Sequence, residues 1–242
     1  VLSMALGAGE TSLIDLTAAY ASFVNGGKKV EPSLIDRIQD RRGKNIFLEN
    51  FAACTNCDEP YIEENPMPKL VNSSESIFDE AKSYQMVSIL KGAVDRGTGR
   101  KTKIDGIEIA GKTGTTNNNT DAWFIGFTSD LIIGVYAGFD KPKSLGKRET
   151  GSSVAVPIFR DFVKNYYQEK PILPFTIPNG IELIKINYDT GEIASNFNSS
   201  ESVYEAFSKS DKLVSSGEIL VGSEGFQIIE VADEVMEEYV IY

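Results

Sequence analysis

One short run of this chain combines the residue types that could do chemistry: Ala110-Gly111-Lys112-Thr113-Gly114-Thr115-Thr116. Its lysine offers an ammonium group, its threonines offer hydroxyl donors, and its two glycines allow another backbone to come close. The preceding Gly106-Ile107-Glu108-Ile109 alternates apolar and polar residues with a period of two, which predicts a strand. The sequence therefore predicts a strand with a cationic, hydroxyl-rich end along which a ligand could lie.

Two interpretations compete for this run. Residues 106–113 fit the phosphate-binding pattern G-x-x-x-x-G-K-[ST], which implies a nucleotide site. Such a site needs a flexible loop whose N–H groups wrap the phosphates, followed by the N-terminus of a helix. Here the intervening Ile-Glu-Ile-Ala favours a strand, and the following Thr-Gly-Thr-Thr-Asn-Asn-Asn is a poor start for a helix. Nucleotide binding is therefore kept as the weaker alternative.

The second interpretation is the Lys-Thr-Gly box of the penicillin-recognising serine enzymes, at residues 112–114. Three residues alone would be weak evidence, but the similarity is wider. Together with Asp121-Ala122-Trp123-Phe124 and Gly126, the run closely resembles the transpeptidase domain of class A penicillin-binding proteins, the bifunctional peptidoglycan synthases. The resemblance covers residues from about Ser3 to Asp161 and extends more weakly to Phe207.

This resemblance implies an α/β fold of the α+β type, with an antiparallel sheet packed by helices. It corresponds to the C-terminal portion of a penicillin-binding transpeptidase or serine β-lactamase-like fold. We accordingly expect residues 1–170 to form the C-terminal part of a transpeptidase domain. Residues 171–242 begin with a proline-marked linker and are expected to form a small C-terminal extension, with an acidic tail that is partly disordered after about Asn198.

The resemblance also implies an activity: peptidoglycan cross-linking by D,D-transpeptidation through an acyl-serine intermediate, with β-lactams acylating the same serine. It gives the catalytic roles in this chain to Lys112 and to Thr115, whose backbone N–H is one of two oxyanion-hole donors. The substrate-binding residues that it implies, which hold the ligand's terminal carboxylate and leave room for a peptide that binds like an added strand, are Lys112, Thr113, Gly114, Thr115 and Thr116. No metal and no cofactor is implied.

The nucleophilic serine is expected to lie outside this chain. In the resembled family the Ser-x-x-Lys and Ser-x-Asn motifs precede the box, and this chain begins at Val1. We therefore expect the C-terminal portion of a larger protein, with a glycosyltransferase domain upstream. Ser-x-x-Lys matches do occur at Ser88 and Ser144, but 22 Ser and 17 Lys in 242 residues give roughly 1.5 matches by chance. The isolated chain is expected to be inactive, and a non-catalytic module that binds peptidoglycan or β-lactams is the alternative.

Composition limits the partners. The chain has no histidine, which rules out a histidine-based triad within it, and its net charge of −11 argues against nucleic-acid binding. No apolar run approaches the ~20 residues of a membrane-spanning helix, so membrane attachment is expected only through the missing N-terminal part. The expected partners are peptidoglycan stem peptides, β-lactams and the upstream part of the same protein, at the periplasmic face of the bacterial inner membrane. Because that upstream part should contribute core, the isolated chain is expected to self-associate.

Three helices are predicted from apolar periodicity. Ser12 and Asp15 resemble a capping box before an apolar face over residues 13–24, which ends at two glycines. A second helix begins at about Asp79, and a third covers residues 153–168. The inward faces predicted for these two helices are Met86, Ile89, Leu90, Ala93 and Val94 in the second, and Ile158, Phe159, Phe162, Val163 and Tyr166 in the third.

Hairpins are predicted at residues 32–48, at residues 121–136, and over the short stretch 181–194. With the box strand, the second hairpin should give three adjacent antiparallel strands. Trp123 is interpreted as a core anchor under the active site rather than a substrate platform. The two cysteines, Cys54 and Cys57, suit a zinc half-site, a redox motif or a local disulfide. We favour the disulfide, consistent with the oxidising compartment that the resemblance implies.

Overall fold

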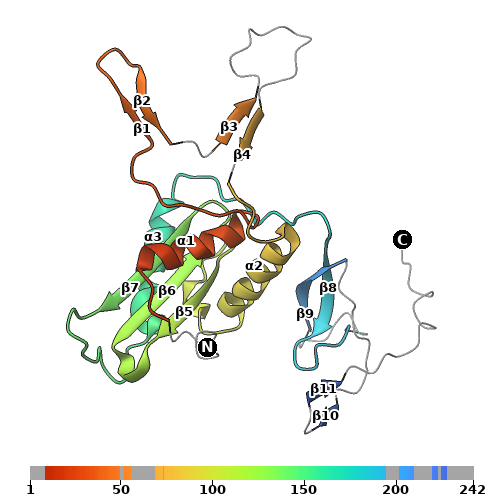
Figure 1. Cartoon of the computed structure of the whole chain (residues 1–242). Helices are drawn as coiled ribbons and strands as arrows, with labels where there is room; N and C mark the ends of the chain where they lie inside the picture. The colour runs from red at the N-terminus through yellow and green to blue at the C-terminus, as the bar shows by residue number, and fades with distance from the viewer. Residues whose placement is uncertain are drawn as a thin grey trace. The chain divides into compact units, whose positions relative to one another are not determined.

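The computed structural model describes residues 9–49, 52–55, 69–72, 74–194, 202–209, 220–222 and 225–227. These residues form helices and antiparallel strands in two compact units, residues 1–179 and 180–242 (Figure 1). The mixed class predicted from the sequence, antiparallel sheet with helices, is confirmed.

The first unit is built on a three-stranded antiparallel sheet in the order β5-β6-β7. Its strands are β5 (Ala110–Thr115), β6 (Asp121–Phe127) and β7 (Ile132–Gly138), as predicted for the box strand and the hairpin after it. The predicted start of the box strand is wrong, because Ile104 and Ile107 form a bridge across a tight turn. Gly106 within that turn has a φ of 80°, a backbone conformation that favours glycine. The alternation before residue 110 therefore belongs to a turn and its exit.

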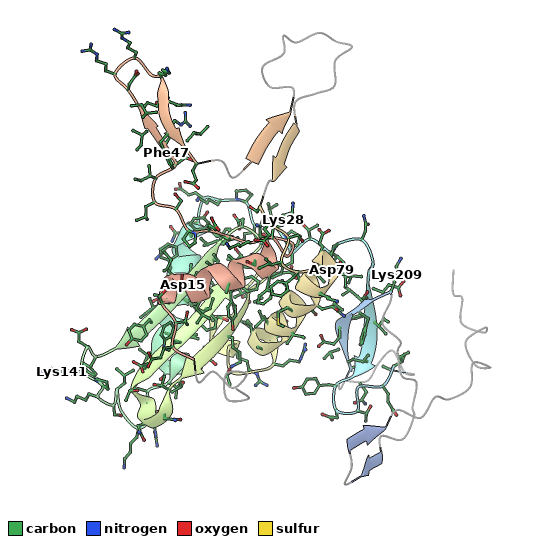
Figure 2. The ribbon with its side chains drawn as sticks, viewed as in Figure 1. Asp15, Lys28, Phe47, Asp79, Lys141 and Lys209 are labelled. Atoms are coloured by element: carbon green, nitrogen blue, oxygen red, sulfur yellow. The ribbon has the colours of Figure 1, made fainter. Side chains whose placement is uncertain are left out.

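Two helices begin and end where local signals predict. α1 (Leu13–Val24) starts after Ser12, whose Oγ accepts the N–H of Asp15 at 3.1 Å, and it is followed by two glycines with positive φ. α2 (Glu80–Asp95) starts after Asp79, whose carboxylate accepts two N–H groups of the first turn. Figure 2 labels Asp15 and Asp79 at these starts. Such caps satisfy N–H groups that have no partner inside the helix.

The third helix, α3 (Val156–Tyr166), follows a π-helical turn, η4 (Gly151–Ala155). That turn begins with a capping box in which the side chains of Thr150 and Ser153 serve each other's backbone N–H groups. The helical segment therefore starts before residue 153. A side-chain cap combined with a tightly packed first turn explains the earlier start.

The predicted inward faces of α2 and α3 are only partly correct. In α3, Phe159 and Val163 are fully buried, as is Val156, but Ile158 and Phe162 are 54% and 53% exposed. In α2, Leu90 and Val94 are buried, whereas the predicted Met86 and Ile89 are among the exposed large apolar side chains. Each helix meets the sheet along a narrow stripe, so apolar residues beside that stripe remain in solvent.

α1 and α2 pack on one face of the sheet and α3 on the other (Figure 1). On the first face, Phe127 clusters with Val87 and Leu90 of α2. On the second, Phe124 clusters with Phe159 and Val163 of α3. Side chains alternate between the faces of a strand, so Phe124 and Phe127, three residues apart on β6, serve opposite faces.

Two small antiparallel strand pairs also belong to the first unit. β1 (Arg37–Gln39) pairs with β2 (Asn45–Leu48), which confirms the predicted hairpin, and β3 (Ala52–Thr55) pairs with β4 (Lys69–Asn72). Cys54 lies in β3, but Cys57 falls outside the described residues, so the disulfide stays a prediction.

The segment predicted as a linker after residue 170 packs onto this unit. The backbone N–H of Phe175 donates to Glu108 Oε2 at 2.9 Å, and Ser129 Oγ donates to the carbonyl of Leu173 at 2.8 Å. The Phe175 ring is 8% exposed and its centroid lies 5.9 Å from that of Phe127. The expected boundary at residue 170 stays a prediction.

The second unit contains two antiparallel strand pairs. β8 (Ile181–Asn187) pairs with β9 (Ser202–Ser208), and β10 (Leu220–Gly222) pairs with β11 (Gly225–Gln227). The hairpin predicted over residues 181–194 is reduced to a single bridge between Ile186 and Ile193. No strand was predicted at β9, because its partner lies beyond the range of local turn signals.

Candidate active site

The Lys-Thr-Gly box lies on an edge strand. Within the described residues, β5 pairs only with β6. Just beyond its end, the N–H of Thr116 donates to the carbonyl at the start of β6, at 3.1 Å. Hydrogen-bonded pairs alternate along an antiparallel ladder, so the N–H and C=O of Gly114 and Lys112 also face β6. Those of Thr113 and Thr115 face the open edge.

The Lys112 side chain lies along that same edge. It is exposed, and its Nζ donates to the backbone carbonyl of Thr113 at 2.9 Å. A positive charge therefore lies beside the outward-facing N–H of Thr115, where an anionic ligand group would be attracted.

Two threonine hydroxyls of β5 are held by segments distant in sequence. Thr113 Oγ1 lies 2.6 Å from Thr98 Oγ1, in the turn after α2, and either hydroxyl can donate. Thr115 Oγ1 accepts the backbone N–H of Gly151, the first residue of η4, at 3.0 Å. The sequence does not single out Thr98 or Gly151; the Thr150/Ser153 capping pair marks the start of η4 but not this contact.

The Thr116 hydroxyl stabilises the turn between β5 and β6 by hydrogen bonds. Its Oγ1 bonds Thr120 Oγ1 at 2.8 Å and Asp121 Oδ2 at 2.9 Å, and it also accepts the Asp121 N–H at 2.9 Å. Asp121 Oδ1 in turn accepts the Tyr136 hydroxyl at 2.8 Å. Hydrogen bonds from Tyr136 and then Thr116 lower the pKa of Asp121. The role of Thr116 in substrate binding stays a prediction, since its hydroxyl is already committed to this network.

Trp123 is not the core anchor expected from the sequence. It is only partly buried, and its ring packs against Tyr136, which is 42% exposed, with centroids 4.8 Å apart. The buried aromatic of β6 is the neighbouring Phe124, whose ring meets Phe159 edge to face at 4.8 Å. Trp123 and Phe124 point to opposite faces, and α3 covers the face of Phe124.

The competing motifs do not form comparable sites. The Gly-Lys-Thr of the phosphate-loop pattern lies inside β5, and the helix after it, η3 (Asn117–Asn119), has three residues. Ser88 lies in the middle of α2, and Lys91, its pattern partner, is ion-paired with Asp95 at 3.1 Å and with Glu108 at 3.8 Å. A lysine held as a paired ammonium is poorly placed to take a proton from a serine.

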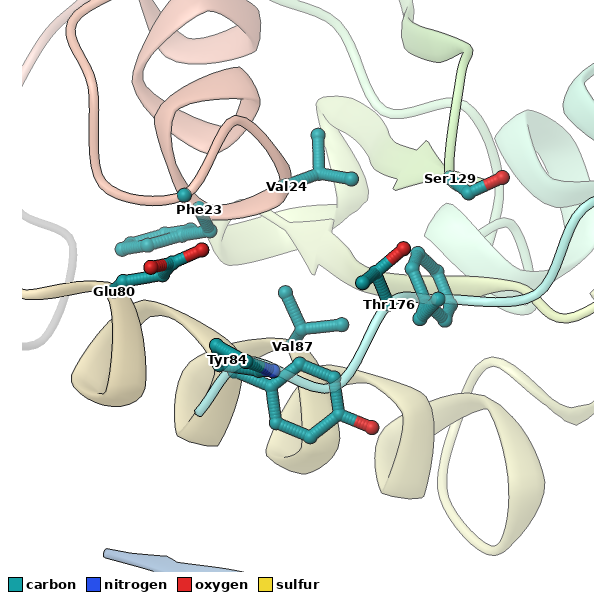
Figure 3. Close-up of a pocket in the computed structure, with 10 residues that line it drawn as sticks. Phe23, Val24, Glu80, Tyr84, Val87, Ser129 and Thr176 are labelled. Carbon is teal, nitrogen blue, oxygen red and sulfur yellow. The ribbon is translucent and has the colours of Figure 1, made fainter. Parts of the chain in front are cut away.

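The remaining Ser-x-x-Lys match lies in a turn, and a cavity lies between α1 and α2. Ser144 Oγ accepts the N–H of Gly146 at 3.1 Å, a local turn bond. A cavity of about 130 Å³ lies between α1, α2 and the segment around Phe175 (Figure 3). Tyr84 and Phe23 are among its lining side chains, and none of its lining residues belongs to β5. Among the described residues there is no group of three or more potential metal ligands, and no helix long and apolar enough to cross a membrane.

Comparison with known proteins identifies the family of this chain. Residues 1–164 match the family model described as penicillin binding protein transpeptidase domain. Penicillin-binding protein 1A of Rickettsia conorii is 47% identical over 199 residues, covering 80% of this chain and 25% of that protein. The Rickettsia typhi protein of the same name is 40% identical over 245 residues, covering 99% of this chain and 30% of that protein.

A solved structure agrees with these relatives. Penicillin-Binding Protein 1A from Haemophilus influenzae is 27% identical, with a TM-score of 0.68, and the match covers 86% of this chain and 33% of that one. The chain thus spans about a quarter to a third of the length of these proteins. With the family model matching well over half of its residues, the chain belongs to the penicillin-binding protein transpeptidase domain family.

Proposed function

We propose that this chain supplies the Lys-Thr-Gly part of a D,D-transpeptidase site that cross-links peptidoglycan and is a target of β-lactams. The observation that carries the proposal is the open edge of β5. There the alternation of the ladder directs the Thr115 N–H outward, beside the Lys112 ammonium and the Thr113 hydroxyl. The edge can pair with an extended peptide and hold its terminal carboxylate.

In the proposed reaction a serine Oγ attacks the carbonyl carbon of the D-Ala-D-Ala amide. The Thr115 N–H donates to the oxygen that becomes negatively charged, while Lys112, Thr113 and the Thr115 hydroxyl bind the terminal carboxylate. Collapse of the intermediate breaks the C–N bond, the proton that the serine hydroxyl loses ends on the leaving amine, and D-Ala departs to leave an acyl-serine. The amine of a second stem peptide then attacks this ester and regenerates the serine.

The nucleophile is proposed to come from residues outside this chain, because neither Ser-x-x-Lys match has a suitable setting. Lys91 is bound by two carboxylates, and the hydroxyl of Ser144 accepts a bond within its own turn. A glycosyltransferase domain upstream and a site of action at the extracytoplasmic face of the inner membrane are part of this proposal. They are supported by the greater length and the names of the relatives.

Acylation of the full-length protein by a fluorescent penicillin tests the role of Lys112. Loss of a charged hydrogen bond to a carboxylate should lower the second-order acylation rate of Lys112→Ala about 10- to 100-fold. The matched control is Lys141→Ala, another exposed lysine of the same unit (Figure 2), which should acylate like the wild type. Equal rates in all three proteins would remove Lys112 from the site.

The isolated 242-residue chain tests the origin of the nucleophile. It should remain unlabelled by the same penicillin while the full-length protein is labelled. Covalent labelling of the chain that Ser88→Ala abolishes would overturn the proposal of an external serine. Reversible, non-covalent retention of penicillin by the full-length protein would instead support the binding-module alternative.

We also propose that the isolated chain self-associates. Ile158 and Phe162 on α3, and Ile89 on α2, expose 54%, 53% and 60% of their surface. Apolar side chains gathered on helix faces favour association. Light scattering should give a mass that rises with concentration, and a constant monomer mass would contradict this.

A further inference from the structure

The turn η4, which precedes α3, lies close to the backbone of the Lys-Thr-Gly box. Gly151, at its start, is buried and lies against the backbone of Gly114. A Cβ on Gly151 would lie 2.6 Å from the Gly114 carbonyl oxygen and would also meet the carbonyl oxygen of Trp123. Only glycine allows η4 this approach, and the approach brings the Gly151 N–H to 3.0 Å from Thr115 Oγ1.

The donor is carried by a rigid element. Ala155 and Val156, which follow in the same helical segment, are fully buried, as is Phe159 one turn later. The Thr150/Ser153 capping box fixes the first turn from the other side. Because all these groups are packed or bonded, the position of the Gly151 N–H is determined by the core and not by the exposed end of β5.

We propose that Gly151 is a positioning residue, whose backbone N–H turns the Thr115 hydroxyl into a donor directed at the ligand. This inference rests on the proposed function. An N–H group can only donate, so it occupies a lone pair of Thr115 Oγ1 and cannot receive the hydroxyl proton. Within the described residues the Thr115 hydroxyl has this bond alone. Its proton is therefore left for an acceptor outside the described residues.

The neighbouring hydroxyl shows the contrast. Thr113 Oγ1 is hydrogen-bonded to Thr98 Oγ1, and either hydroxyl can donate. The Thr113 hydroxyl can therefore donate either to Thr98 or to a ligand, whereas the Thr115 hydroxyl can donate only to a ligand. The ligand group that suits a fixed donor on the strand that also carries the Lys112 ammonium is an anionic acceptor, the carboxylate of a stem peptide or β-lactam.

The test removes the donor without adding an atom. In the full-length protein, glycolic acid in place of Gly151 converts its amide into an ester and deletes the N–H. The control is the same amide-to-ester change at Ser152, the next residue of the same turn. The measured quantity is the carboxylate preference: the acylation rate of a penicillin divided by that of its methyl ester. A merely structural defect would slow both reactions and leave the ratio unchanged.

The ester at Gly151 should lower the carboxylate preference about 2- to 10-fold, the range for one neutral hydrogen bond. Thr115→Val should lower the carboxylate preference at least as much, whereas Thr115→Ser, which keeps the hydroxyl, should retain it. In the Thr115→Val protein the Gly151 ester should lower the preference no further. The Ser152 ester should behave as wild type.

Three results would overturn the inference. An unchanged preference in the Gly151 ester, or equal losses for both substrates, would leave Gly151 with a structural role only. Additive effects of the Gly151 ester and Thr115→Val would show that Gly151 does not act through that hydroxyl. A wild-type protein without any carboxylate preference would reject the proposed function as well, which distinguishes the two failures.

Discussion

The two glycines of the box run, Gly111 and Gly114, should respond in opposite ways to alanine. A Cβ on Gly111 would lie 2.6 Å from the carbonyl oxygen of Ile125, 2.7 Å from Phe124 Cζ and 2.9 Å from the Cα of Gly126. A Cβ on Gly114 would meet only the side chain of Trp123, at 3.1 Å from its Cβ. One glycine is required by packing, and the other is not.

The distances give the size of the effect. Ordinary contacts of a Cβ start at 3.4 Å, so Gly111→Ala is 0.8 Å too close to a carbonyl of the β5–β6 ladder, and Gly114→Ala is 0.3 Å too close to Trp123. Relieving the first overlap requires a shift of strand or core, and overpacking of this kind costs about 1–3 kcal/mol. The partly exposed Trp123 can relieve the second. In the unfolded chain alanine has less conformational freedom than glycine, which offsets about 0.4–1 kcal/mol of the cost of the Gly114→Ala overlap.

Denaturant unfolding of the isolated chain measures stability, and penicillin acylation of the full-length protein measures the site. Gly111→Ala should lose about 1–3 kcal/mol, or about 2–12 °C in Tm at this chain length. Gly114→Ala should stay within about 0.5 kcal/mol of wild type and still acylate more slowly, because its methyl group lies in the proposed substrate-binding run. Equal stability losses in the two variants, or a stable Gly111→Ala, would refute this account of the strand.

Three further predictions concern the core and the charges. Burial raises the pKa of Tyr167 to about 12, above the ordinary ~10 of the unfolded chain, so stability present below pH ~10 should be lost as pH rises toward 12; Tyr167→Phe should flatten this loss in melting curves. The Tyr136 hydrogen bond lowers the pKa of Asp121, so stability present above the ordinary carboxyl pKa should be lost as pH falls below it, and Asp121→Asn should remove that dependence below about pH 4. Phe159→Ala, at a fully buried side chain, should cost about 3–5 kcal/mol in denaturant unfolding, against less than about 1 kcal/mol for the exposed Phe162→Ala.

Local signals predicted the elements whose causes are local. The limits of α1 follow from the Ser12 cap and from two glycines, all within a few residues of the helix ends. The β6–β7 hairpin follows from alternation on either side of a short turn. In both places the residues that specify the structure also adopt it, so no tertiary information is needed.

The sequence does not predict which of the two faces of a strand is buried against a helix. Trp123 and Phe124 are adjacent aromatics on one strand, and either could fill the core. α3 decides, because it covers the face of Phe124 and leaves Trp123 partly exposed. The contact between Gly151 and Thr115, 36 residues apart, is set by the same packing. β9 was missed for a related reason, since its pairing with β8 depends on a distant partner.

The same physical point separates the two interpretations of residues 106–113. A phosphate loop directs several consecutive N–H groups at one anion. In β5 the ladder takes the N–H groups of Lys112 and Gly114, so the N–H groups that face the open edge, such as those of Thr113 and Thr115, are two residues apart. Two residues of a strand span about 6.7 Å, too far for those two N–H groups to converge on one phosphate. That spacing is the repeat of an extended peptide, which offers an acceptor on the same side at every second residue. Strand pairing, rather than the identity of the glycines, lysine and threonine, therefore favours a peptide-like ligand over a nucleotide.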